Sequence, residues 1–150
     1  MPITAATLDD IADLAPLFAG YLEFYQVPAP AEQIHAFLEQ RLRRQESVVF
    51  LARDATGEAQ GFVQLYPFFA SLALRPAWLV SDLYVLPQAR RDGLGEALMN
   101  AARAHAEATG ACGLQLETAR SNLTGQRLYE RLGYRRDETY LTYWLDLGAR

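Results

Sequence analysis

The sequence predicts one domain of mixed α/β architecture over residues 1–150, with a central sheet of six to seven strands and about four helices. Three observations support this fold class. Half of the 150 residues are hydrophobic, which is enough for one core of ordinary size. The predicted elements follow the order β-α-α-β-β-β-α-β-α-β, with hairpin strands first and a strand–helix–strand crossover later. A turn containing Gly93 and Gly95 joins a predicted strand to a predicted helix.

The first half of the chain reads as one strand, two helices and a hairpin. A short strand over Ile3 to Ala6 precedes a capping box in residues 7–10, where a helix should begin. Prolines at 28 and 30 separate this helix from a second one over about Ala31 to Gln45. A buried strand over Ser47 to Arg53, a turn and a return strand over Gln60 to Phe69 follow.

The second half alternates strands with helices. A strand that follows Arg75-Pro76 reaches Leu86, and an amphipathic helix runs from Gly93 to about Thr109. A strand over Leu114 to Thr118 and a short helix over Thr124 to Leu132 come next. Residues 140–147 alternate as a strand does, and a further short strand is possible at 134–136.

Composition and charge exclude several classes of protein. No run of about 18 apolar residues is present, so we expect no membrane span. The formal net charge of −4 argues against general nucleic-acid binding, so we expect no nucleic-acid partner. Cys112 is the one cysteine, which excludes an internal disulfide and favours a cytoplasmic setting. The two histidines, His35 and His105, lack metal-ligand spacing, so no metal site is expected.

The Gly93–Gly95 turn has the composition of an anion site. Two glycines in the first turn of a helix are unfavourable by about 1 kcal/mol each relative to alanine, which makes sense where a ligand approaches the backbone closely. Free N–H groups and the positive end of the helix dipole attract anions there. Arg90 and Arg91 precede the glycines, which suggests a pyrophosphate cradle. An ordinary glycine-rich turn with solvated arginines is the alternative.

Two segments resemble the GCN5-related N-acetyltransferases (GNAT). One is Leu83-Tyr84-Val85 followed by Arg90-Arg91-Asp92-Gly93-Leu94-Gly95, and the other is Asn122 with Leu128-Tyr129-Glu130-Arg131-Leu132-Gly133-Tyr134. Arg91, Asp92 and Gly125 depart from the residues common in that family. More loosely, residues 64–67, 81–85 and 116–118 resemble its histone and polyamine acetyltransferase-like subgroup.

The resemblance implies acetyl-CoA as cofactor. The pantetheine arm would pair with main-chain groups of Leu83, Tyr84 and Val85, and Asn122 would bond it. The amides from Arg91 through Asp92, Gly93, Leu94 and Gly95 to Glu96 would hold the pyrophosphate, with Arg90 and Arg91 adding charge-assisted contacts. A helix N-cap is the alternative role for Asn122, and both roles are compatible.

Acetyl transfer to an amine also needs a proton donor and a base. Tyr129 would donate to the developing thiolate, because a phenol with a pKa of about 10 stays protonated at pH 7. Deprotonating a lysine-like amine at pH 7 costs about 4.6 kcal/mol, so a base is expected. Asp82 and Glu117 are the candidates, acting through a water. Structural roles are the alternatives: a core tyrosine for Tyr129 and a cap for Asp82.

The acceptor site is the least determined part. Tyr21, Glu23, Tyr25 and Tyr66 would give an aromatic and acidic lining suited to a cationic amine, although core or dimer contacts would explain them too. We expect direct acetyl transfer to a small amine, a polyamine or a protein amine, and a homodimer is possible. Two other functions stay open: a catalytically silent CoA-binding sensor of the same fold, and a nucleotide-phosphate binding module.

Overall fold

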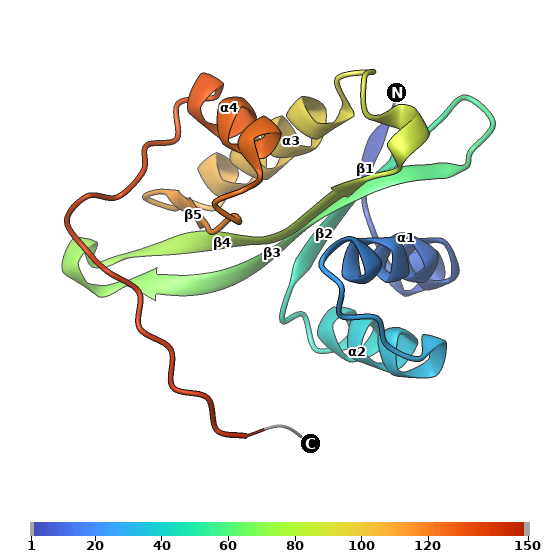
Figure 1. Ribbon diagram of the computed structural model, residues 1–150, viewed down its shortest axis with the longest axis horizontal. Helices are drawn as coiled ribbons and strands as arrows, with labels where there is room; N and C mark the ends of the chain where they lie inside the picture. Colours follow the sequence, from blue (N-terminus) through green and yellow to red (C-terminus); the bar gives the residue numbers. More distant parts are fainter. Residues whose placement is uncertain (1, 149–150) are drawn as a thin grey trace. The chain divides into compact units, whose positions relative to one another are not determined.

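The chain separates into two compact units, Met1–Glu117 and Thr118–Arg150. Of these, the computed structural model describes residues 2–148. Each unit is described by itself. The first unit holds the sheet and three α-helices, and the second holds one α-helix followed by an extended segment (Figure 1). This order confirms the predicted α/β class.

The sheet of the first unit has five strands in the order β1-β2-β3-β4-β5. The strands are β1 (Ile3–Ala5), β2 (Val48–Arg53), β3 (Ala59–Ala70), β4 (Arg75–Val85) and β5 (Leu114–Leu116). Neighbours pair antiparallel from β1 to β4, and β5 pairs parallel with β4. The parallel pair is the strand–helix–strand crossover that the sequence predicts, with the intervening helix packed on the sheet.

Helices cover both faces of this sheet. In Figure 1, α1 (Ile11–Phe24) and α2 (Ala31–Arg43) lie on one face, and α3 (Leu94–Ala108) lies on the other. Short 3-10 turns occupy Leu8–Asp10, Ser71–Ala73 and Pro87–Ala89. The core on the α1 and α2 side contains Leu14, Leu17, Phe18, Ile34, Leu38, Val49, Leu51 and Phe62. Tyr21 and Tyr84 pack against this core, so they are anchored on the face where β3 and β4 meet α1.

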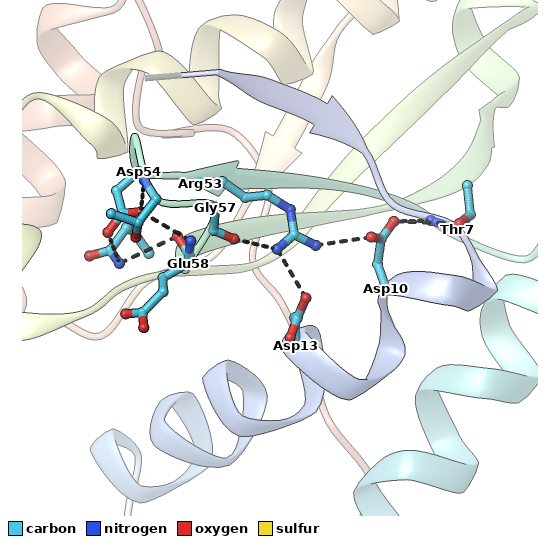
Figure 2. A network of polar contacts seen from close by, with 9 residues as sticks. Thr7, Asp10, Asp13, Arg53, Asp54, Gly57 and Glu58 are labelled. Atoms are coloured by element: carbon cyan, nitrogen blue, oxygen red, sulfur yellow. Dashed lines mark hydrogen bonds and ion pairs between the residues drawn. The ribbon is translucent and has the colours of Figure 1, made fainter.

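A polar network joins the start of α1 to the hairpin between β2 and β3. The Arg53 guanidinium donates to Asp10 and Asp13 at 2.9 Å each and to the Gly57 carbonyl oxygen at 2.8 Å (Figure 2). Asp10 also accepts from the Thr7 main-chain N–H at 2.8 Å, which completes the predicted capping box. One arginine therefore connects the hairpin to the start of α1, which lies 40 or more residues earlier in the sequence.

The second unit contains α4 (Leu123–Arg131), close to the predicted helix. The strand predicted over residues 140–147, and the shorter one at 134–136, are wrong: residues 134–148 form neither helix nor strand. The alternating pattern is there, but a strand also needs a hydrogen-bonded neighbour. The large side chains of residues 140–147 are 67–90% exposed. The sheet accordingly has five strands instead of six to seven.

Candidate active site

The candidate site lies at the part of β4 that has a neighbouring strand on one side only. β5 pairs with β4 only at Trp78, Leu79 and Val80. From Ser81 to Val85, β4 has β3 on one side and, among the described residues, no strand on the other. The main chain of Leu83, Tyr84 and Val85 therefore lies at an open sheet edge, to which an extended ligand can add.

The glycine turn leads from this edge into α3. Gly93 is the N-cap residue with a φ of +74°, a left-handed conformation that favours glycine. Gly93 has no side chain with which to cap the helix, and the first intrahelical bond runs from the Ala97 N–H to the Gly93 carbonyl oxygen at 3.1 Å. A Cβ atom added at Gly93 would meet nothing within 4 Å. The helix start thus offers open space, N–H groups and a positive dipole end to an anion.

Arg90 points back toward the sheet. Its Nε donates to the Val85 carbonyl oxygen at 2.9 Å, and its guanidinium lies 5.7 Å from the ring centre of Phe24 and 5.6 Å from that of Tyr84. Arg90 therefore satisfies the last carbonyl of β4 and joins it to the end of α1. Arg91 and Asp92 are exposed at the turn.

A β-bulge brings Asp82 opposite Gln64. Gln64 pairs with Asp82 and the next residue, Leu65, pairs with Val80, so Ser81 is the extra residue on β4. The Gln64 side-chain Nε2 donates to Asp82 Oδ2 at 2.8 Å. Gln64 is fully buried and Asp82 is 9% exposed. Of the two candidate bases, Asp82 is the buried one, whereas Glu117 is exposed just after β5.

Burial governs the acidity of this cluster. Desolvation raises the pKa of Asp82, and hydrogen bonds from Gln64, Tyr21 and Ser81 oppose that shift. Desolvation, with the nearby Asp82 charge, raises the pKa of Tyr66 to about 12. Tyr66 therefore stays a neutral phenol beside a carboxyl group that is more basic than an exposed one.

The four acceptor-site candidates divide into two pairs. Tyr21 and Tyr66 lie by Asp82, and the Tyr21 hydroxyl also donates to the Ser81 carbonyl oxygen at 3.3 Å. Tyr25 packs edge-on against Tyr21, with ring centres 5.1 Å apart, and Glu23 is exposed on α1. Two of the predicted aromatic lining residues thus lie beside Asp82, and Tyr25 is joined to them through Tyr21. The predicted acidic lining residue, Glu23, is not part of this cluster.

Sequence reasoning missed Gln64 as a site residue. The available signal was an amide side chain within the apolar run of β3, between Val63 and Leu65. An uncharged polar residue among core residues needs a hydrogen-bond partner, and here the partner is Asp82.

Asn122 and Tyr129 belong to the second unit. Asn122 is the N-cap of α4: its Oδ1 accepts from the Gly125 N–H at 3.1 Å and its Nδ2 donates to Thr118 Oγ1 at 3.0 Å. A Cβ at Gly125 would lie 2.5 Å from Asn122 Nδ2, so a larger residue there would require the Asn122 side chain to shift. Tyr129 is half-buried on α4, with its ring centre 6.1 Å from that of Tyr134.

Residues 2–148 contain no group of three or more His, Cys, Asp or Glu side chains that could hold a metal ion. In the same part of the chain, every helix is too short or too polar to cross a membrane.

Comparison with known proteins decides the family. Residues 14–134 match the family model described as acetyltransferase (GNAT) family. The chain belongs to the GNAT family of acetyltransferases. Both motif segments, Leu83 to Gly95 and Asn122 to Tyr134, fall within the matched residues.

The GNAT assignment agrees with individual relatives. The chain is 39% identical to the uncharacterized N-acetyltransferase YhfO of Bacillus subtilis (strain 168), over the full length of both. It is 38% identical to a probable acetyltransferase of Haemophilus influenzae over 63% of this chain and 64% of that one. The crystal structure of a probable acetyltransferase superposes with a TM-score of 0.94 at 39% identity, covering both chains completely.

A more distant GNAT structure bears on the fold alone. An aminoglycoside N-acetyltransferase solved in complex with CoA superposes with a TM-score of 0.80 at 20% identity, over 96% of this chain and 93% of that one. The five-stranded sheet with helices on both faces is therefore the GNAT fold.

Proposed function

We propose that this GNAT enzyme transfers the acetyl group of acetyl-CoA directly to a primary amine, with Asp82 as the base. The observation that carries the proposal is the position of Asp82: a buried carboxyl group on β4, immediately before the three residues of the open edge. A small amine, a polyamine and a protein amine all offer the required ammonium group.

The donor side of the site fits acetyl-CoA. The open edge at Leu83, Tyr84 and Val85 has the form to pair with the pantetheine amides, and the uncapped start of α3 at Gly93 suits a pyrophosphate. Amides through Glu96 and the exposed Arg91 would add donors. Bound there, acetyl-CoA supplies a thioester carbonyl carbon. Because the chain is acidic overall, with a net charge of −4, local features must hold this anion.

Asp82 removes a proton from the acceptor. The acceptor ammonium passes one proton to the Asp82 carboxylate, directly or through one water, and the neutral amine then attacks the thioester carbon. A carbon–nitrogen bond forms as the carbon–sulfur bond breaks, and Asp82 later releases its proton to solvent. Burial suits this role because it makes the carboxyl group a stronger base than an exposed aspartate.

Tyr129 supplies the proton for the thiolate. Its role, like that of Asn122 in bonding the pantetheine arm, is carried over from the family motif at residues 122–134. As the carbon–sulfur bond breaks, Tyr129 gives its hydroxyl proton to the sulfur, and the nitrogen loses its second proton to solvent. Tyr129 recovers a proton from solvent, so each turnover releases one net proton. Capping α4 occupies Asn122 Oδ1, and the second hydrogen of its Nδ2 can serve a ligand carbonyl.

A screen of acceptors tests the proposal. Thiol release from acetyl-CoA is measured with polyamines, amino acids, aminoglycosides and lysine peptides. We expect at least one amine to raise turnover, and Tyr129→Phe to lower that turnover with CoA affinity within a few-fold of native. Tyr143→Phe, at a side chain that is 87% exposed, is the control. Tight binding of acetyl-CoA without amine-dependent turnover would instead support a CoA-binding sensor.

Two further parts of the proposal concern the setting of the enzyme. We propose a cytoplasmic setting, which the single cysteine favours, and a homodimer as one possible assembly. Size-exclusion chromatography with light scattering tests the homodimer, and a measured mass equal to that of one chain would reject the dimer. Cell fractionation tests the compartment.

A further inference from the structure

We propose that Gln64 is a positioning residue for the acetyl transfer: its side-chain amide holds Asp82 as an oriented carboxylate that can accept the proton of the acceptor. This inference rests on the proposed function, in which Asp82 is the base.

The geometry of the hairpin fixes the pair. Gln64 lies on β3 directly opposite Asp82 on β4, and the bulge at Ser81 sets this register. The 2.8 Å bond from Gln64 Nε2 to Asp82 Oδ2 is buried, and both residues belong to the same antiparallel pair of strands. The amide therefore directs one carboxyl oxygen toward β3 and leaves the other for a different partner.

Packing alone does not account for an amide at position 64. Within the described residues, Gln64 Oε1 is buried without a hydrogen-bond partner, which is unfavourable. A methionine or leucine of similar size would fill the space without that penalty. The amide orientation also depends on charge, because turning it over would bring Oε1 against an ionised carboxylate. The observed orientation, with Nε2 donating to Asp82 Oδ2, is the one that an ionised Asp82 requires.

Within residues 2–148, the groups that stabilise the Asp82 carboxylate are hydrogen-bond donors and not positive charges. The hydrogen-bonding groups that face it are Gln64 from β3, Tyr21 from α1 and its neighbour Ser81. Tyr66 also faces Asp82 and stays neutral. Besides Asp82, the charges of Arg41 and Glu46 act on the pKa of this phenol, and these two side chains form an ion pair of 2.8 Å. Hydrogen bonds therefore oppose the effect of burial on Asp82, and among them the bond from Gln64 lowers the pKa of the carboxyl group most.

The first test measures the carboxyl group itself. Carbon-13 NMR follows the titration of the Asp82 side chain in the protein without cofactor, with Asp82→Asn to assign the signal. We expect Asp82 to be ionised at pH 7 in the native protein, and Gln64→Met to raise its pKa by about one unit. Gln60→Met is the matched control, because Gln60 lies on the same strand and donates to Asp54 at 3.2 Å. It should leave the Asp82 titration unchanged.

The second test uses the pH dependence of kcat/KM. In Gln64→Met the acid limb should move upward by the same amount as the carboxyl pKa, with activity regained at high pH, whereas Asp82→Asn should remove the limb. A native pH profile in Asp82→Asn would reject Asp82 as the base, and with it the proposed mechanism. Loss of the limb in Asp82→Asn together with an unmoved limb in Gln64→Met would reject the role of Gln64 alone. If Gln64→Met does not fold, the native titration decides, and a protonated Asp82 at pH 7 overturns the proposal.

Discussion

Gly61 on β3 lies directly against the main-chain carbonyl oxygen of Tyr84 on β4. A Cβ atom at Gly61 would stand 2.9 Å from that oxygen, and 3.2–3.3 Å from Val85 Cγ2 and Leu98 Cδ1. The absence of a side chain at position 61 therefore lets the two strands and α3 approach one another at the end of β4 that forms the open edge.

Replacing Gly61 by alanine should destabilise the protein. The nearest atom belongs to the backbone and cannot turn away, so β4 must shift at Tyr84 and Val85. We expect the free energy of unfolding in urea to fall by about 2 kcal/mol, and CoA affinity to fall with it. Gly113→Ala is the control, because a Cβ there meets nothing within 4 Å and its φ is not positive. Equal urea midpoints for the two variants would contradict this account of Gly61.

The Arg53 network should contribute measurably to stability. Arg53→Met removes the ion pairs to Asp10 and Asp13 and the bond to the Gly57 carbonyl, so we expect a loss of about 1 kcal/mol in urea unfolding. Arg43→Met breaks only an exposed pair with Glu39 on α2 and should cost about 0.3 kcal/mol. High salt should narrow the difference between these variants, and a difference that grows with salt would argue against an electrostatic origin.

His105 should make the fold less stable in mild acid. Its ring lies 4.8 Å from that of Trp78 and 5.7 Å from that of Phe50, and its Nε2 is buried without a partner among the described residues. Burial lowers the pKa of His105 below its ordinary value of 6.5. As the pH falls through 6.5, the unfolded chain takes up a proton that the folded chain refuses, so the free energy of unfolding decreases.

Comparison of two variants isolates this effect. The free energy of unfolding of the native protein minus that of His105→Phe should decrease from pH 7.5 to pH 5.5, because only the native protein carries the titrating group. His35→Phe, at an exposed position on α2, is the control for the replacement of a histidine by phenylalanine. Parallel pH profiles for native protein and His105→Phe would show that this histidine is protonated freely in the folded state.

Gly93→Glu should abolish CoA binding through bulk and charge at the start of α3. Gly93→Ala places a side chain at the same φ of +74° and so has the same backbone strain, but it adds no carboxylate. It should bind CoA far better than the glutamate variant does. Gly110→Glu adds the same residue at the same φ, at the other end of α3, and should bind CoA as the native protein does. Calorimetric affinities of the three variants decide whether the cradle lies at Gly93.

Much of the fold could be predicted because local signals marked its boundaries. Thr7 to Asp10 form the predicted capping box, and Gly93 and Gly110 flank α3 in left-handed conformations. Residues 140–147 show where local pattern is insufficient, because alternation does not provide a neighbouring strand. The Gln64–Asp82 pair and the turn of Arg90 toward Val85 were also beyond prediction, since both depend on which residues of different segments meet in space.

Two of the three groups that hydrogen-bond to Asp82 come from different parts of the architecture. Gln64 shares a hairpin with it, whereas Tyr21 arrives on α1, a separate helix held to the hairpin between β2 and β3 by Arg53. In the proposed mechanism, the hairpin of β3 and β4 carries the base and the amide that positions it, whereas α1 carries side chains expected to line the acceptor site. In the course of evolution, α1 could be remodelled for a new acceptor while the inherited hairpin kept its chemistry.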